Sequence, residues 1–149
     1  SGWTQLGSDL TDTTEPRLAA RDHALYLALG RVGSASGAMQ VLRWQGGVWR
    51  ELPSPGEGSA RSLALTPQGR PLVAFTDLGS PTRLRVSHFS EGAWHELGSG
   101  VTDVGQPDLN AVLDLDARER PVVLFTDPVQ EGGTQRYDVR VARYSESIR

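Results

Sequence analysis

The sequence predicts an all-β protein built from a repeated unit of four short strands. The stretch 61–98, RSLALTPQGRPLVAFTDLGSPTRLRVSHFSEGAWHELG, contains four strand-like runs separated by clusters of turn-forming residues. The rest of the chain repeats this stretch twice, imperfectly. Four-stranded units that recur along a chain are typical of a β-propeller, in which each unit forms one blade.

The unit that defines the repeat is Arg61–Gly98. The segments between its expected strands are rich in Gly, Pro and Ser, which favour tight turns. Its four strands are expected at Ser62–Thr66, Pro71–Asp77, Arg83–Phe89 and Ala93–Leu97.

An earlier copy of the unit spans Arg17–Leu52. In this copy Leu25, Leu27 and Leu29 alternate with other residues, and a period of two indicates a strand with one face more buried than the other. The polar residues Ser8–Pro16 are expected to be a connector that leads into it.

A later copy spans Asn110–Tyr144. The string FTD occurs at Phe75–Asp77 and again at Phe125–Asp127, in both cases where the second strand of the unit is expected to end. Residues 99–110 are expected to connect these two copies, and residues 128–136 are expected to form a longer loop.

The later copy lacks a fourth strand, whereas the N-terminal residues match one. Their sequence WTQLG, at Trp3–Gly7, aligns with WHELG at Trp94–Gly98. Propellers commonly build the closing blade from two chain ends, because this removes a free sheet edge. The predicted blades, in a single domain over residues 1–149, are Arg17–Leu52, Arg61–Gly98, and Asn110–Tyr144 completed by Trp3–Gly7.

Three blades are too few to close a ring, because propellers carry about 4–8 blades. One solution is a homodimer with twofold symmetry, in which each Trp3–Gly7 strand completes the third blade of its partner and the ring has six blades. A segment of a longer propeller chain would show the same pattern. An open three-bladed monomer is the remaining alternative.

Composition excludes several classes of partner and cofactor. The net charge of −3 gives no basic patch for nucleic acid or an anionic membrane. No run approaches the roughly 18 apolar residues of a membrane helix, so membrane insertion is not expected. The chain has no cysteine, and its three histidines lack metal-ligand spacing. We therefore expect neither a metal site nor a cofactor.

Two strings are the best-preserved parts of the repeat. They are Gly69-Arg70-Pro71 followed by Val73-Ala74-Phe75, and Arg120-Pro121 followed by Val123-Leu124-Phe125. With the W-x-x-L-G strand, the repeat resembles a family of bacterial propeller-like repeats of the pattern S-L-A-L-x-x-x-G-R-P-x-V-A-F, common in exported proteins and lipoproteins of myxobacteria. This resemblance implies a propeller and an exported protein, in the periplasm, on the cell surface or secreted. It implies no particular activity, and the first copy departs from it by lacking the G-R-P and F-T-D strings.

Four residues are candidate ligand-binding residues: Asp77, Asp127, Arg70 and Arg120. The two aspartates could line a groove or hold Ca²⁺, but a capping role in the following turn is favoured, since Asp commonly accepts hydrogen bonds from turn amides. The arginines precede the second strand. Arginines on the third strands, at positions 83, 85, 140 and 143, are expected on a solvated face.

Tryptophan recurs at one strand position, as Trp3, Trp49 and Trp94. It could be a stacking platform for a sugar ring. Recurrence at a fixed position in the blade favours packing between adjacent blades instead.

The sequence favours a non-catalytic binding or scaffold module that recognises a glycan or a protein partner through its loops or channel mouth. The alternative is a glycosidase or lyase, which needs two carboxylates about 5–10 Å apart. Asp77 and Asp127 are the only repeat-related pair for that role, and with no G-x-S-x-G motif we nominate no catalytic residue. A structural segment of a larger surface protein is a third possibility.

Overall fold

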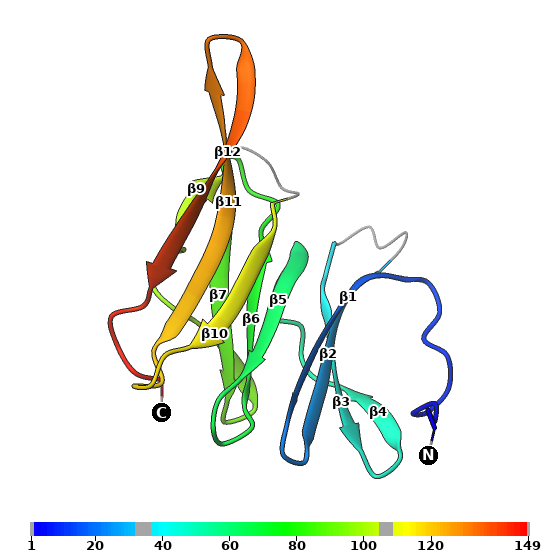
Figure 1. Ribbon diagram of the computed structural model, residues 1–149. Coiled ribbons are helices and arrows are strands. Elements are labelled where there is room, and N and C mark those ends of the chain that lie inside the picture. Colours follow the sequence, from blue (N-terminus) through cyan, green and yellow to red (C-terminus); the bar gives the residue numbers. More distant parts are fainter. Residues whose placement is uncertain (1, 32–36, 105–108, 149) are drawn as a thin grey trace.

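Twelve strands form three antiparallel sheets in the computed structural model, which describes residues 2–31, 37–104 and 109–148 (Figure 1). No helix occurs in these residues, so none of them forms a helix that could cross a membrane. The chain is therefore all-β, as predicted. Sheet 1 contains β1 (Thr13–Arg21), β2 (Ala24–Arg31), β3 (Gln40–Gln45) and β4 (Val48–Glu51). Sheet 2 contains β5 (Ser59–Leu65), β6 (Pro71–Thr76), β7 (Thr82–Ser90) and β8 (Ala93–Glu96), with β9 (Thr102–Val104) also beside β7. Sheet 3 contains β10 (Ala111–Leu115), β11 (Pro121–Glu131) and β12 (Thr134–Arg143).

The three sheets share one register. Leu18 pairs with Leu27 in sheet 1, Leu63 with Val73 in sheet 2, and Leu113 with Val123 in sheet 3. We call residues equivalent when they hold the same place in this register. Trp44, Phe89 and Tyr144 are equivalent in this sense.

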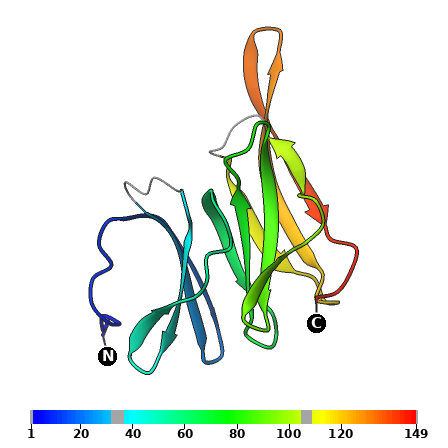
Figure 2. The ribbon, with the colours of Figure 1, turned by 180° about the vertical axis from the view of Figure 1, so that it is seen from behind.

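Sheet 2 lies between the other two and is covered on both faces (Figures 1 and 2). On one face Val73 and Phe75 join a core with residues of sheet 1, and on the other Leu72 and Ala74 join a core with residues of sheet 3. All six residues of β6 are buried, which explains why PLVAFT is almost continuously apolar.

Sheet 1 begins earlier than the sequence predicts. β1 starts at Thr13, not Arg17, because Thr13 and Thr14 already pair with the end of β2. A bulge interrupts the pairing between Thr14 and Arg17, where Glu15 has a φ of 52° and Pro16 has no N–H to donate. Because this part of the strand is polar and irregular, its sequence indicates a connector.

Two segments expected to be loops contain strand. The connector 99–110 includes β9, which pairs with β7 beyond the point where β8 ends. The segment 128–136 continues β11 and β12 as a long hairpin, which closes at Gly132 and Gly133, both with positive φ. Asp127 therefore lies inside a strand and does not end one.

Sheet 3 has three strands, one fewer than the predicted blade. Gly2–Leu6 form no strand, and the exposed side of β12 carries no strand among the residues that the structure describes. The segment lies against sheet 1 instead, where the indole N–H of Trp49 donates to the carbonyl of Leu6 at 3.1 Å. In this position they lie beside sheet 1, and sheet 2 lies between sheet 1 and β12 (Figures 1 and 2).

Removing side-chain volume from sheet 2 tests the packing. Leu72 is fully buried in the core shared with sheet 3, so Leu72→Ala should lower the free energy of unfolding by about 2–5 kcal/mol. Leu78→Ala removes the same atoms from a residue that is 64% exposed, so it should change the free energy of unfolding by less than about 1 kcal/mol. Urea unfolding measures both variants, and equal losses would contradict the assigned core.

Candidate functional site

Asp77 organises the turn that follows β6. Its Oδ1 accepts hydrogen bonds from the backbone N–H of Gly79 at 3.1 Å and of Arg83 at 2.8 Å. The carboxylate thereby holds both sides of the turn between β6 and β7. This is the capping role that the sequence favours for Asp77.

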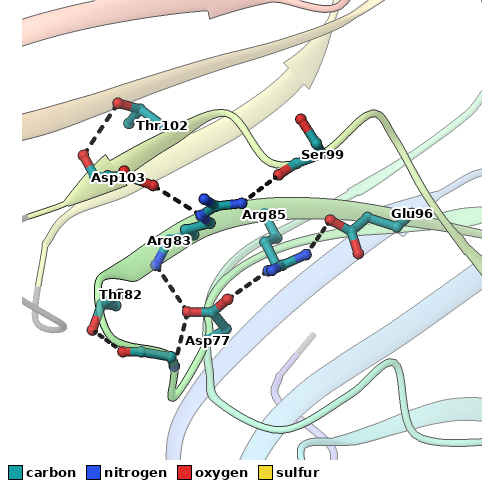
Figure 3. A network of polar contacts seen from close by, with 9 residues as sticks. Asp77, Thr82, Arg83, Arg85, Glu96, Ser99, Thr102 and Asp103 are labelled. Atoms are coloured by element: carbon teal, nitrogen blue, oxygen red, sulfur yellow. Dashed lines mark hydrogen bonds and ion pairs between the residues drawn. The ribbon is translucent and has the colours of Figure 1, made fainter.

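The other oxygen of Asp77 binds a strand arginine. Arg85 Nε lies 2.6 Å from Asp77 Oδ2, and Arg85 Nη1 lies 2.5 Å from Glu96 Oε1 on β8 (Figure 3). The side chains of Asp77, Arg85 and Glu96 are 15%, 25% and 36% exposed, so one edge of the cluster reaches solvent. We call these three residues the polar cluster.

The electrostatics of the cluster favour the charged forms of Asp77 and Arg85. Partial burial alone would raise the pKa of Asp77, but the N–H of Arg83, the guanidinium of Arg85 and the N–H of Gly79 together hold that pKa below its ordinary value. Asp77 in turn raises the pKa of Arg85, and Glu96 adds to this effect. The cluster is a fixed set of charged donors and acceptors, and its geometry follows from strand register.

A second ion pair extends this polar edge toward β9. Arg83 Nε lies 2.9 Å from Asp103 Oδ1, and its Nη1 donates to the carbonyl of Ser99 at 3.4 Å (Figure 3). Both side chains are about half exposed. The third-strand arginines expected on a solvated face are thus ion-paired in sheet 2.

Sheet 3 repeats part of the polar cluster. Arg85 pairs with Phe75 in register and Arg140 with Phe125, so the two arginines are equivalent. Arg140 Nη2 lies 3.0 Å from Asp127 Oδ2, as Arg85 contacts Asp77. Sheet 3 has no fourth strand in the described residues, so no residue stands where Glu96 stands, and Arg140 is 53% exposed.

The two predicted arginines lie away from the two aspartates. Arg70 and Arg120 precede β6 and β11, whereas Asp77 follows β6 and Asp127 lies seven positions along β11. Since a strand rises about 3.3 Å per residue, the two groups are roughly 20 Å apart along the sheet. The four candidate residues therefore lie in two groups, the aspartates toward one end of the sheets and the arginines at the other.

Arg120 has a structural role at its end of the sheet. Its Nη2 lies 2.7 Å from Asp116 Oδ2, and Asp116 also accepts the backbone N–H of Arg118 and of Arg120. The side-chain hydrogen bond of Arg120, with the backbone hydrogen bonds, lowers the pKa of Asp116 to about 2. In sheet 2 the hydroxyl of Thr66, equivalent to Asp116, accepts the N–H of Arg70 at 3.1 Å.

Arg85, Arg140 and Glu96 are not among the residues that the sequence nominates for the site, and Arg85 and Arg140 were expected on a solvated face. A signal was present, because each F-T-D string is followed by an arginine in a strand that alternates charged and apolar residues. The contacts of these arginines with the carboxylates follow only from the register of the paired strands. Cross-strand neighbours that are far apart in sequence cannot be found without it.

A cavity of about 360 Å³ opens between sheets 2 and 3. Leu97 and Gly98 line it from sheet 2, and Val123, Ala142 and Tyr144 line it from sheet 3. At the junction of sheets 1 and 2, the equivalent place is filled by Trp94, which packs on that core and donates its indole N–H to the carbonyl of Pro53 at 2.7 Å. The cavity therefore marks a tryptophan position of the repeat.

Comparison with known proteins identifies a related fold. No protein-family model and no curated protein matches the chain. A solved structure, the fucose lectin from Kordia zhangzhouensis in complex with methyl-fucoside, superimposes with a TM-score of 0.54. The match covers 90% of this chain and 100% of that chain at 12% sequence identity. At this identity, the match shows a shared fold.

The described residues offer little for metal or acid–base chemistry. Residues 2–31, 37–104 and 109–148 contain no group of three or more His, Asp or Glu side chains that could hold a metal ion. A glycosidase general acid needs a raised pKa, and the pKa of Asp77 is lowered. Asp77 is better suited to accepting hydrogen bonds than to donating a proton.

The lowered pKa of Asp77 predicts a pH dependence of stability. Its ion pair and hydrogen bonds stabilise the fold above the ordinary pKa of 3.8, and this contribution is lost as pH falls through the lower pKa of the folded state. The unfolding free energies of the wild type and Asp77→Asn, measured in urea, should differ most at pH 5–7 and converge below pH 3.8. A difference that stayed constant down to pH 2 would contradict the assignment.

Proposed function

We propose that the protein is a non-catalytic glycan-binding module of the β-propeller type, with a sugar site at the polar cluster Asp77, Arg85 and Glu96. The observation that supports this most is the cluster itself, because its donors and acceptors are fixed by three strands before any ligand binds. The shared fold with a fucose lectin supports the same reading.

The chemistry of the cluster suits sugar hydroxyls. A hydroxyl both donates and accepts, so neighbouring hydroxyls of one ring can accept from a guanidinium and donate to a carboxylate. Leu78 follows Asp77 in the turn and is 64% exposed, which offers an apolar surface for the C–H face of the sugar. Recognition therefore needs neither a metal nor a bound cofactor.

The proposal includes the assembly. The three sheets form half of a six-bladed ring that a homodimer closes, since about 4–8 blades are needed for closure. A C2 ring would carry two polar clusters of the sheet 2 type, and two sites bind a multivalent glycan more tightly than one. Export, which the repeat family implies, is part of the same proposal.

Arginine-to-leucine variants test where the sugar binds. A glycan array first identifies the preferred sugar. Calorimetry at low salt then measures the affinity of each variant for it, and methyl-fucoside is a suitable first probe. Because hydrogen bonds to charged groups contribute about 1.5–3 kcal/mol, Arg85→Leu should weaken binding of the preferred sugar roughly 10-fold or more. Arg70→Leu, at the opposite end of β6, should leave the affinity unchanged.

Two results would count against this site. Equal losses in both variants would indicate a general effect on the fold, which circular dichroism of each variant would reveal. A loss in Arg70→Leu alone would place the site at the other end of the sheets. Binding of no glycan on the array would overturn the functional proposal itself.

A further inference from the structure

Among residues 2–31, 37–104 and 109–148, no strand pairs with the free edge of β12, whereas the equivalent strands of the other two sheets are paired on both edges. β3 is covered by β4, and β7 is covered by β8 and then by β9. Their pairing positions are known residue by residue: Trp44 pairs with Trp49 and Phe89 with Trp94. By equivalence, a fourth strand on β12 would place a tryptophan opposite Tyr144.

The cavity between sheets 2 and 3 fits that tryptophan. Trp94 packs against Phe89 with ring centroids 5.2 Å apart and planes inclined at 59°, as Trp49 packs edge-on against Trp44 at 5.1 Å and 60°. At the cavity, Tyr144 is the equivalent ring, and the neighbouring Leu97 and Gly98 stand where Leu52 and Pro53 stand around Trp94. The walls of the cavity are thus those of a tryptophan position, including the backbone that would accept the indole N–H.

Sheet 3 also has an exposed apolar face, which indicates that another sheet packs beside it. In sheet 2 the equivalent positions Ala74, Leu84 and Val86 are at most 4% exposed, because sheet 3 covers them. In sheet 3 the positions are apolar as well but are 41–64% exposed. They are Leu124, Val139 and Val141, and the neighbouring Val112 is 60% exposed. A face patterned like a buried one indicates that another sheet packs on it.

The chain itself contains the segment that fits. Trp3–Gly7 has the W-x-x-L-G sequence of the fourth strands, and the side chain of Trp3 is fully exposed. The carbonyl of Leu6 already accepts from Trp49, one position before the residue that corresponds to Pro53, whose carbonyl accepts from Trp94. The segment therefore sits beside sheet 1 almost as the end of one repeat's fourth strand sits beside the next sheet.

This placement decides which copy can use the segment. Its end is bound to sheet 1, and sheet 2 separates sheet 1 from β12 (Figures 1 and 2). A chain cannot complete its own third sheet without leaving these contacts. A second copy can, because a preceding sheet beside sheet 1 would bring its own β12 next to Trp3–Gly7.

We propose that Trp3–Gly7 of a second copy adds to β12 as its fourth strand, with Trp3 in the cavity between sheets 2 and 3. The proposal rests on the six-bladed homodimer and specifies how it closes. Trp3 would lie opposite Tyr144 and Gln5 opposite Ala142, as Trp94 and Glu96 lie opposite Phe89 and Ser87. Gln5 then stands beside Arg140 in the place of Glu96, so the second copy completes a polar cluster in sheet 3.

Light scattering behind size exclusion tests both the homodimer and the docking of Trp3–Gly7 on β12. One chain is 16.1 kDa, and the wild type should elute as a particle of about twice that mass. Trp3→Ala removes the buried ring, and Ala142→Trp fills the cavity from its own wall, so each should raise the dimer dissociation constant roughly 30-fold or more. Leu10→Ala, in the nearby connector, should leave the dimer unchanged.

Mixing the two variants gives a sharper test. A heterodimer of Trp3→Ala with Ala142→Trp has one junction with an intact Trp3 and an intact cavity, so the mixture should dimerise more tightly than either variant alone. A monomeric wild type would overturn the ring and the docking together. A dimeric wild type whose two variants also remain dimeric would overturn the docking and leave the ring standing.

Discussion

An indole N–H bound to the carbonyl of the preceding repeat fixes how one sheet follows another. Trp49 donates to Leu6 and Trp94 to Pro53, while each ring packs at a steep angle against an aromatic residue of the adjacent strand. Burying the polar N–H of a large ring is costly unless the N–H has a hydrogen-bond partner. The indole hydrogen bond therefore sets the spacing and the orientation of neighbouring sheets. The W-x-x-L-G string therefore encodes the contact between sheets as well as a strand.

The same fourth strand also builds the polar cluster. Arg85 meets two carboxylates because β8 brings Glu96 beside it, whereas Arg140 has only Asp127 among the described residues. The core junction and the proposed ligand site thus depend on one element. In sheet 2 both are complete, whereas sheet 3 has no fourth strand among the described residues. In the proposed dimer, the junction between copies and the polar cluster of sheet 3 both depend on five residues, Trp3–Gly7.

Much of the fold could be predicted from the repeat, because turns and alternating apolar residues mark strands locally. The expected strand Pro71–Asp77 corresponds to β6, and the expected hairpin after Phe89 is present. The bulge near Glu15 and the long β11–β12 hairpin were missed, since polar and glycine-containing segments are typical of loops until their strand partners are known.

Of the predicted site residues, Asp77 and Asp127 do face equivalent arginines, but Arg70 and Arg120 lie at the other end of the strands. Which end a residue occupies follows from the strand order, but which charges meet there depends on register.

A disulfide between two copies is the most direct measurement of the proposed register. The N–H of Leu97 donates to Val86, so the neighbouring pair Ser87 and Glu96 is of the non-hydrogen-bonded kind, with the shorter separation between side chains. The equivalent pair across the proposed junction is Ala142 and Gln5 of the second copy, and the chain has no cysteine of its own. The double variant Gln5→Cys with Ala142→Cys should form covalent dimers on mild oxidation, and Gln5→Cys with Arg143→Cys, whose side chain points to the other face, should not. Equal cross-linking in the two variants, or none in the first, would contradict the docking of Trp3–Gly7 on β12.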